Sequence, residues 1–180
     1  TLAPLLGWTT VDITRTSAGH TGYKIGLILT LENKDTRTNS KYVLTNNGTI
    51  DFAGEKSIGI QIYAPDSPSL VEVANTNKMN IGGTASYGMK WSSRVAPNST
   101  MENTGTINVS GDNGDADSLS SGIAVIENKS YNGANSIRAY QGKVTNSGTI
   151  NVSGGKANTG MVLIVNAKDD ITNTANGTIN

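Results

Sequence analysis

The sequence of 180 residues predicts an all-β protein: a right-handed parallel β-helix (solenoid) of about six coils of about 29 residues, with loop insertions. Three observations lead to this prediction. A nine-residue phrase recurs along the chain, a second phrase follows each copy of it, and Gly, Asn, Ser and Thr are too dense for helices. Self-similarity at a fixed period is typical of architectures in which equivalent residues stack on one another.

The first phrase has the form apolar-x-Asn-x-Gly-Thr-Ile-x-apolar. It occupies residues 44–52, 101–109 and 144–152, and a fourth copy runs from Ile171 to Asn180. Its last part alternates apolar and polar residues, as a strand does when one face is buried. The apolar residue two places before the Asn indicates that another strand arrives at the turn. We therefore expect two short strands and a tight corner in every copy.

A fifth copy is disguised. Residues 73–81 fit the phrase if Asn77 fills the Gly position and Met79 the Ile position. Asn adopts positive φ more readily than most other residues with a side chain, which suggests a reason for the exchange. The Ile position then recurs every 28 or 29 residues, except for one interval of 43 between Ile107 and Ile150.

Stacking would place equivalent residues above one another. The Ile positions would form an internal column, the Asn amides would bond up and down the stack at a corner, and the Gly positions would supply a left-handed backbone there. The expected column is Ile50, Met79, Ile107, Ile150 and Ile179. The expected ladder is Asn46, Asn75, Asn103, Asn146 and Asn173. The expected left-handed glycines are Gly48, Gly105, Gly148 and Gly177.

A second phrase follows each copy of the first: a short polar segment, a Gly, and then alternating apolar residues. Examples are Gly59-Ile60-Gln61-Ile62 and Gly160-Met161-Val162-Leu163. This pattern predicts a third strand in each coil. An earlier instance begins at Gly26 without a clear first phrase before it. We therefore expect one β-helical domain over residues 1–180, with 1–40 irregular or a first coil and 41–180 in clear repeats.

The alternative fold is a β-sandwich or meander of antiparallel hairpins. Asn-Gly at positions 47–48 and 176–177 is typical of hairpin turns and favours it. A sandwich does not need the same residue type in the same position of every repeat, whereas a solenoid does. The recurrence therefore favours the parallel β-helix.

Composition excludes several classes of protein. Basic and acidic residues balance, 14 against 14, so no basic surface points to nucleic acid. The absence of cysteine excludes a disulfide scaffold, thiolate metal sites and a cysteine nucleophile. No stretch approaches the roughly 20 apolar residues of a membrane-spanning helix. The N-terminus lacks the features of a signal peptide and the C-terminus stops within a phrase, so we expect a piece of a longer protein.

Function is expected where the chain departs from the repeat, because the stack uses the repeated positions. The long repeat contains two extra segments, at 111–118 and 127–142, and another departure follows the strand at Gly88. Large aromatic and cationic side chains in these places are the best candidates for partner contacts. They are Tyr131, Arg138, Tyr140, Trp91 and Arg94. The alternation also points Trp91 inward, which makes a core or cap residue the competing interpretation.

We expect no catalytic site, no metal and no cofactor. Asp112, Asp115 and Asp117 could hold calcium, but their spacing matches no common calcium loop, and a solvated acidic loop is the simpler interpretation. His20 is the only histidine, and no serine lies in a nucleophile motif. Beside the Ile column the outward position holds Asp51 once and Asn in the other copies, whereas glycan-processing enzymes need paired carboxylates.

The segments Thr145–Gly155 (TNSGTINVSGG) and Asn158–Leu163 (NTGMVL) carry a family resemblance. They resemble the passenger repeats of type V autotransporters, most of all the very large outer-membrane adhesins of fusobacteria, and the resemblance extends over residues 41–180. It implies a monomeric virulence passenger at the cell surface, held by a C-terminal β-barrel beyond these residues. It also implies adhesion to host cell-surface proteins or glycans, or to partner bacteria. The balanced charge, in turn, predicts no nucleic-acid partner. Two alternatives stay open: a β-helical polysaccharide-processing enzyme and a purely structural spacer.

Overall fold

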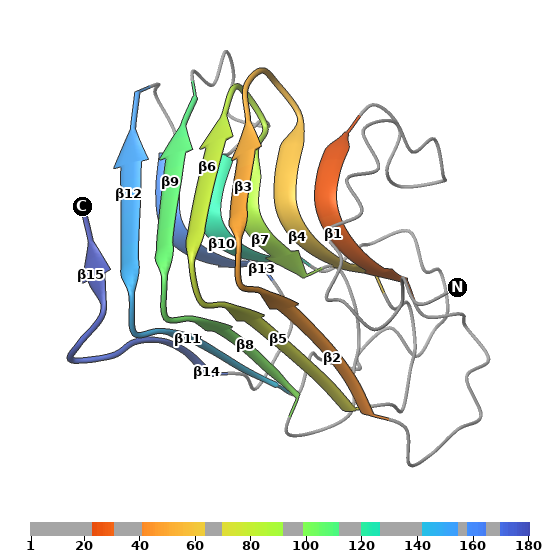
Figure 1. Ribbon diagram of the computed structural model, residues 1–180. Helices are drawn as coiled ribbons and strands as arrows, with labels where there is room; N and C mark the ends of the chain where they lie inside the picture. Colours follow the sequence, from red (N-terminus) through yellow and green to blue (C-terminus); the bar gives the residue numbers. More distant parts are fainter. Residues whose placement is uncertain are drawn as a thin grey trace.

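The computed structural model describes residues 23–30, 41–63, 70–91, 99–111, 120–126, 142–154, 158–164 and 170–180. Within these ranges the chain forms fifteen strands and no helix, and the strands make three five-stranded sheets (Figure 1). No helix in them could therefore span a membrane. All neighbouring strands are parallel. This pairing confirms the predicted parallel β-helix and excludes the antiparallel sandwich.

Each full coil contributes one strand to each sheet. Sheet A contains β1 (Lys24–Thr30), β4 (Ser57–Tyr63), β7 (Tyr87–Trp91), β10 (Ser120–Ile126) and β13 (Asn158–Ile164). Sheet B contains β2 (Lys41–Asn46), β5 (Leu70–Asn75), β8 (Thr100–Asn103), β11 (Lys143–Asn146) and β14 (Asp170–Asn173). Sheet C contains β3 (Thr49–Phe52), β6 (Lys78–Gly82), β9 (Thr106–Ser110), β12 (Thr149–Ser153) and β15 (Thr178–Ile179).

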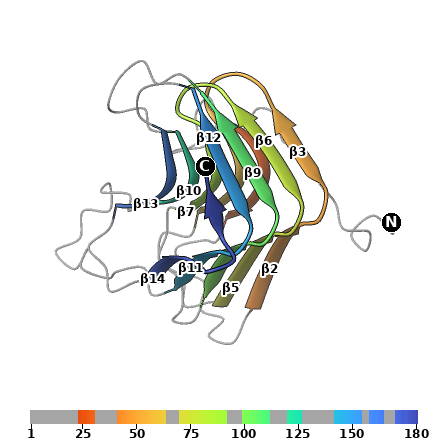
Figure 2. The same ribbon diagram turned by 90° about the vertical axis from the view of Figure 1, so that its left-hand side faces the viewer.

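The three sheets surround a common interior, and Figure 2 shows them as three walls around it. Strands β2 to β13 make four complete coils, with β1 before them and β14 and β15 after them. In each complete coil the chain passes through sheet B, turns a tight corner into sheet C, and continues into sheet A. The described residues thus form parts of six coils, as the repeat count predicts.

The register confirms the internal column and the disguised copy. Ile50 pairs with Met79, and Met79 pairs with Ile107. Ile150 then pairs with Ile107 on one side and with Ile179 on the other. The first four residues of this column are at most 5% exposed, whereas Ile179 in the last strand is 42% exposed. Met79 therefore occupies the Ile position, although the local sequence around it departs from the phrase.

The long repeat keeps the same register as the others. On one side of its first extra segment β9 pairs with β6 and β12, and on the other side β10 pairs with β7 and β13. After its second extra segment β11 pairs with β8 and β14. The described strands on either side of the additional residues therefore stay in register with the rest of the stack.

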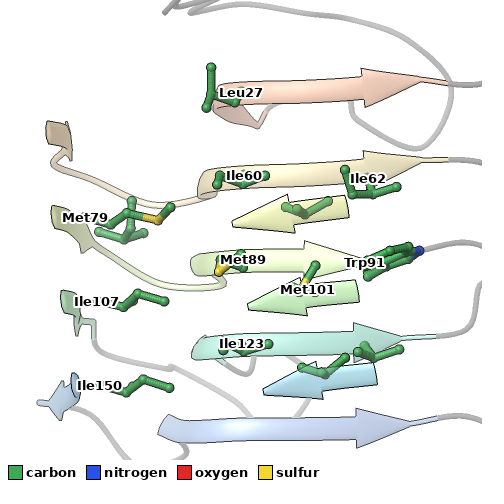
Figure 3. Packing of buried hydrophobic residues seen from close by; sticks show 14 of the residues in the cluster. Leu27, Ile60, Ile62, Met79, Met89, Trp91, Met101, Ile107, Ile123 and Ile150 are labelled. Carbon is green, nitrogen blue, oxygen red and sulfur yellow. The ribbon is translucent and has the colours of Figure 1, made fainter. Parts of the chain in front are cut away.

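The core is made of stacked apolar columns from all three sheets. On sheet A, Leu27, Ile60, Met89 and Ile123 follow one another along the stack, and Ile62 and Trp91 form a second column beside them (Figure 3). Met101 contributes from sheet B. Because each residue packs on its equivalents above and below, burial in one coil depends on the adjacent coils.

The two sequence phrases fit each other across this core. A Cβ built on Gly88 would lie 2.5 Å from the Cγ2 atom of Ile107, and a Cβ on Gly122 would lie 2.4 Å from the Cγ2 atom of Ile150. Such distances leave no space for even a methyl group. The Gly of the second phrase thus leaves space for a side chain. The Ile of the first phrase, in the next coil along the chain, fills this space.

Candidate functional site

Four of the five predicted contact residues lie outside the described residues, namely Tyr131, Arg138, Tyr140 and Arg94. The acidic loop with Asp112, Asp115 and Asp117 and the histidine at position 20 also lie outside them. Trp91 is described. It ends β7, packs beside Ile62 and has no exposed surface (Figure 3). The structure therefore places Trp91 in the core, the competing role that the alternation allows, and a partner on the outer surface would not touch it.

The corner between sheets B and C carries the predicted asparagine ladder. The Nδ2 atom of Asn46 donates to Oδ1 of Asn75 at 2.8 Å, and each of the next three steps, up to Asn173, measures 2.7 Å. The Nδ2 atom of Asn103 also donates to the carbonyl oxygen of Gly105 at 3.2 Å. Both N–H bonds of such an amide are thus used inside the stack, and the side chains of the first four ladder residues are buried. This ladder is structural.

The prediction of left-handed glycines at the same corner is wrong. The described glycines with positive φ are Gly54, Gly83 and Gly154, which lie between sheets C and A. At the asparagine corner the reason for glycine is contact between coils. A Cβ on Gly105 would lie 2.0 Å from the carbonyl oxygen of Asn77, and a Cβ on Gly148 would lie 2.1 Å from that of Gly105. Close stacking, and not backbone conformation, requires glycine here.

Asn77 is accommodated in this position by a longer step. The backbone N of Lys78 lies 3.4 Å from the carbonyl oxygen of Gly48, whereas the equivalent distance from Thr106 to Asn77 is 2.7 Å. The Asn77 amide also donates to the carbonyl oxygen of Asn47 at 2.9 Å. The substitution is therefore tolerated by local spacing and a side-chain hydrogen bond, and Asn77 itself has no positive φ.

A second polar column lies at the corner between sheets C and A. The backbone N of Ser57 donates to Oγ of Ser86 at 3.1 Å, and the backbone N of Ser86 donates to Oγ of Ser120 at the same distance. All three serines are fully buried. The sequence shows them only as a polar segment before each Gly, so their role as bridges between coils was not predicted. These hydroxyls satisfy buried backbone groups.

The outer sides of the three sheets differ in chemistry. Sheet B presents charged groups, including an ion pair of 2.8 Å between Lys41 and Glu72. Sheet A carries an apolar cluster that is separate from the main core and includes Ile25, Ile58 and Tyr87. Sheet C presents mainly amides and hydroxyls, with the charged residues Asp51 and Lys78 in β3 and β6. In the described part of the chain, the three sheets therefore present outer surfaces of different chemistry.

On sheet A, the Nζ atom of Lys90 lies over two tyrosine rings. It is 4.5 Å from the ring centroid of Tyr87 and 5.4 Å from that of Tyr23. Burial lowers the pKa of Lys90 to about 8 and raises the pKa of Tyr23. Burial, and to a smaller extent Tyr23, raises the pKa of Tyr87 to about 12. The two tyrosines come from different coils, so no local sequence pattern could reveal this cage.

On sheet C, a second asparagine ladder runs along the outer side. The Nδ2 atom of Asn108 donates to Oδ1 of Asn80 at 2.7 Å, that of Asn151 to Oδ1 of Asn108 at 2.7 Å, and that of Asn180 to Oδ1 of Asn151 at 2.8 Å. These amides are partly or fully exposed. The amide recurs visibly at this position of the sequence, but the hydrogen bonds between the amides were not predicted.

The described residues contain no group of three His, Cys, Asp or Glu side chains that could hold a metal ion. One hollow of about 400 Å³ lies at the C-terminal end of the stack. Its lining consists of Val152, Ser153, Gly154, Asn158, Gly160, Ile179 and Asn180. No ionisable side chain belongs to this lining, and its polar side chains are those of Ser153, Asn158 and Asn180.

Comparison with known proteins gives no match: no protein-family model, no curated protein and no solved structure is significantly similar to the chain.

Proposed function

We propose that the chain is a segment of a bacterial surface adhesin, an autotransporter passenger whose β-helical stalk presents loops to host cells or to other bacteria. One observation carries this proposal: the strands on both sides of the two extra segments keep the register of the stack. The repeated positions are occupied by the core column and the inner ladder, so the insertions are what this region has in excess of a stalk. The resemblance of the repeats to passenger repeats supports a cell-surface location.

The outer column of sheet C argues against the alternative of a polysaccharide-processing enzyme. Such an enzyme needs two carboxyl groups that approach the same glycosidic bond. Asp51 begins this column, and Asn80, Asn108 and Asn151 follow it in register. A single acid beside a row of amides is not a catalytic pair, which supports an adhesive or structural role.

Adhesion of cells to the immobilised chain tests the proposal. We expect host cells or partner bacteria to adhere, and the triple variant Tyr131→Ala/Arg138→Ala/Tyr140→Ala to lower the affinity more than tenfold, because aromatic and Arg contacts dominate interfaces. Arg94→Ala tests the other predicted segment. The variant Lys41→Ala/Glu72→Ala, on the outer side of sheet B, is the matched surface control and should adhere like the parent chain.

The alternatives give different results in the same assay. Failure of the parent chain to hold any cell type contradicts the proposal and favours a structural spacer. Release of reducing ends or unsaturated sugars from a polysaccharide incubated with the chain contradicts it in favour of an enzyme. Adhesion that persists in the triple variant and in Arg94→Ala would support the adhesive role but would contradict the assignment of the four substituted residues as contact residues.

A further inference from the structure

The outer side of sheet C is built from one short motif. The sequence Thr-Ile-Asn occurs at residues 106–108, 149–151 and 178–180, and the three copies belong to consecutive coils. Ile107 and Ile150 point into the core and Ile179 follows them in register, so the Thr and the Asn of each copy flank the Ile on the outer side. The three Thr residues form one column and the three Asn residues form another. Figure 1 shows the supporting strands β9, β12 and β15 side by side.

The outer Asn ladder fixes the direction of its amides. Each internal rung, Asn108 and Asn151, donates one N–H to the preceding coil and accepts one from the following coil. An Asn amide has two N–H donors and an oxygen that can accept two hydrogen bonds. Each internal rung therefore keeps one donor and one acceptor for a molecule on the outer surface. Because the rungs hold one another, binding would cost little additional side-chain entropy.

This surface is almost free of charge. The outward positions of the described part of sheet C carry Asp51 and Lys78 in the first two coils, and only Thr, Asn and Ser from β9 onward. By contrast, the outer side of sheet B has Lys41, Glu72, Glu102 and Lys143. No cation recurs on the amide surface to attract a phosphate, sulfate or carboxylate. The complementary ligand is neutral and rich in groups that both donate and accept hydrogen bonds.

We propose that the outer side of β9, β12 and β15 binds a neutral, extended glycan that lies along the stack, across the strands. Sugar hydroxyls donate and accept hydrogen bonds, as the remaining amide groups and the hydroxyls of Thr106, Thr149 and Thr178 do. Neighbouring rungs are separated by the strand spacing of about 4.8 Å, close to the length of one sugar unit in an extended chain. Successive sugars would therefore meet equivalent groups.

The proposal predicts weak contacts that accumulate. The outward positions of described sheet C hold no aromatic ring on which a sugar could stack. Affinity would therefore come from several rungs at once, and it should rise with the length of the glycan until the glycan spans the ladder. The proposal concerns the stalk and does not depend on the adhesive role of the inserted loops.

Titration with linear neutral oligosaccharides, from a disaccharide to a hexasaccharide, tests this inference. Isothermal calorimetry should give a Kd that falls with length for the parent chain. The variant Thr106→Val/Thr149→Val removes two hydroxyls from the surface and keeps β-branched side chains that suit a strand. It should weaken hexasaccharide binding at least tenfold. The control Thr145→Val/Thr172→Val makes the same change on the outer side of sheet B and should leave the Kd unchanged.

A second variant tests the amides. Asn108→Asp/Asn151→Asp replaces two donors with carboxylates and should abolish binding, with circular dichroism as the check that the stack is intact. If this variant does not fold, the Thr variant decides alone. Absence of binding by the parent chain, equal affinity for all lengths, equal loss in the sheet B control, or preference for an anionic glycan would each overturn the proposal. Loss of cell adhesion in the insert variants with glycan binding retained would separate the two functions.

Discussion

At the scale of single residues, the position of an Asn relative to the stack decides what it does. Asn103 on the inner ladder is fully buried and bonds to Asn75 and Asn146. Asn108 on the outer ladder belongs to the same coil and makes equivalent bonds to Asn80 and Asn151, but water reaches it. Water can replace a lost partner at the surface but not in the interior.

We therefore expect Asn103→Ala to cost much more stability than Asn108→Ala. The first substitution removes the ladder partner of one buried N–H of Asn75 and of the buried Oδ1 of Asn146, at a cost of about 1–3 kcal/mol for each group. The second should cost less than about 1 kcal/mol, because water solvates the exposed groups. Urea unfolding of the two variants and the parent measures the difference. Equal losses of unfolding free energy in the two variants would show that the inner ladder does not stabilise the chain more than the outer ladder does.

Glycine at the same corner gives a second comparison between two positions of one motif. A Cβ on Gly148 would lie 2.1 Å from the carbonyl oxygen of Gly105, whereas a Cβ on Gly48 would have no described atom within 4 Å apart from those of Gly48 and its two chain neighbours. Gly148→Ala should lower the free energy of unfolding by about 1–3 kcal/mol, the usual cost of overpacking. Gly48→Ala should change it by less than about 0.5 kcal/mol. Similar effects in thermal or urea unfolding would contradict the explanation by close stacking.

At the scale of elements, sheet A combines two unlike sides. Its inner side contributes Ile60 and Met89 to the core, and its outer side holds the Lys90 amine over Tyr87. Desolvation penalises the charged amine in the folded chain, and this is why its pKa is lowered from 10.5 to about 8. The element therefore contains a group that links stability to pH.

Stability should rise with pH between about 8 and 10.5. In this window the folded chain holds fewer protons on Lys90 than the unfolded chain does, so removal of protons favours folding. Below pH 8 the amine is charged in both states and the penalty is present in full. Tyr87 acts in the opposite direction above pH 10, because its pKa rises from 10.0 to about 12 on folding. Maximum stability is therefore expected near pH 10.

The variant Lys90→Met isolates this contribution. It should remove the rise in unfolding free energy between pH 8 and pH 10, measured by urea titration at each pH, and it should be more stable than the parent at pH 7. Lys143→Met, at an exposed position of β11, is the matched control and should keep the rise. Parallel pH profiles for the parent and Lys90→Met would show that another group is responsible.

At the scale of the whole molecule, the chain is a stack in which each coil contacts mainly its neighbours. Equivalent strands pair in every sheet, and the inner ladder passes through each coil once. Stability is then a sum of coils and of the interfaces between them. A change that removes one whole period should preserve the architecture, whereas a change that breaks the period should not.

Deletion of residues 76–103 removes one full period, because Asn75 and Asn103 are equivalent and 28 residues apart. The join places β9 directly after β5 and lets Asn75 bond to Asn146. We expect a folded β-helix one coil shorter, by about 4.8 Å, with a lower unfolding free energy. Small-angle scattering measures the length of the shortened chain, and unfolding followed by circular dichroism measures its unfolding free energy. Deletion of residues 76–89 removes β6 and most of β7 and should prevent cooperative folding; equal behaviour of the two deletions would contradict a modular stack.

The sequence by itself determined the parallel coil, its period, the Ile column and the inner Asn ladder, because each depends on like residues recurring at one interval. It determined even the disguised copy at Asn75 and Met79. Only the tertiary structure decided why glycine occupies the corner, that Trp91 belongs to the core, and that Lys90 lies between Tyr23 and Tyr87. These features depend on distances between coils and on side chains that meet across coils. Periodicity reveals which residues are equivalent, but not how closely their neighbours approach.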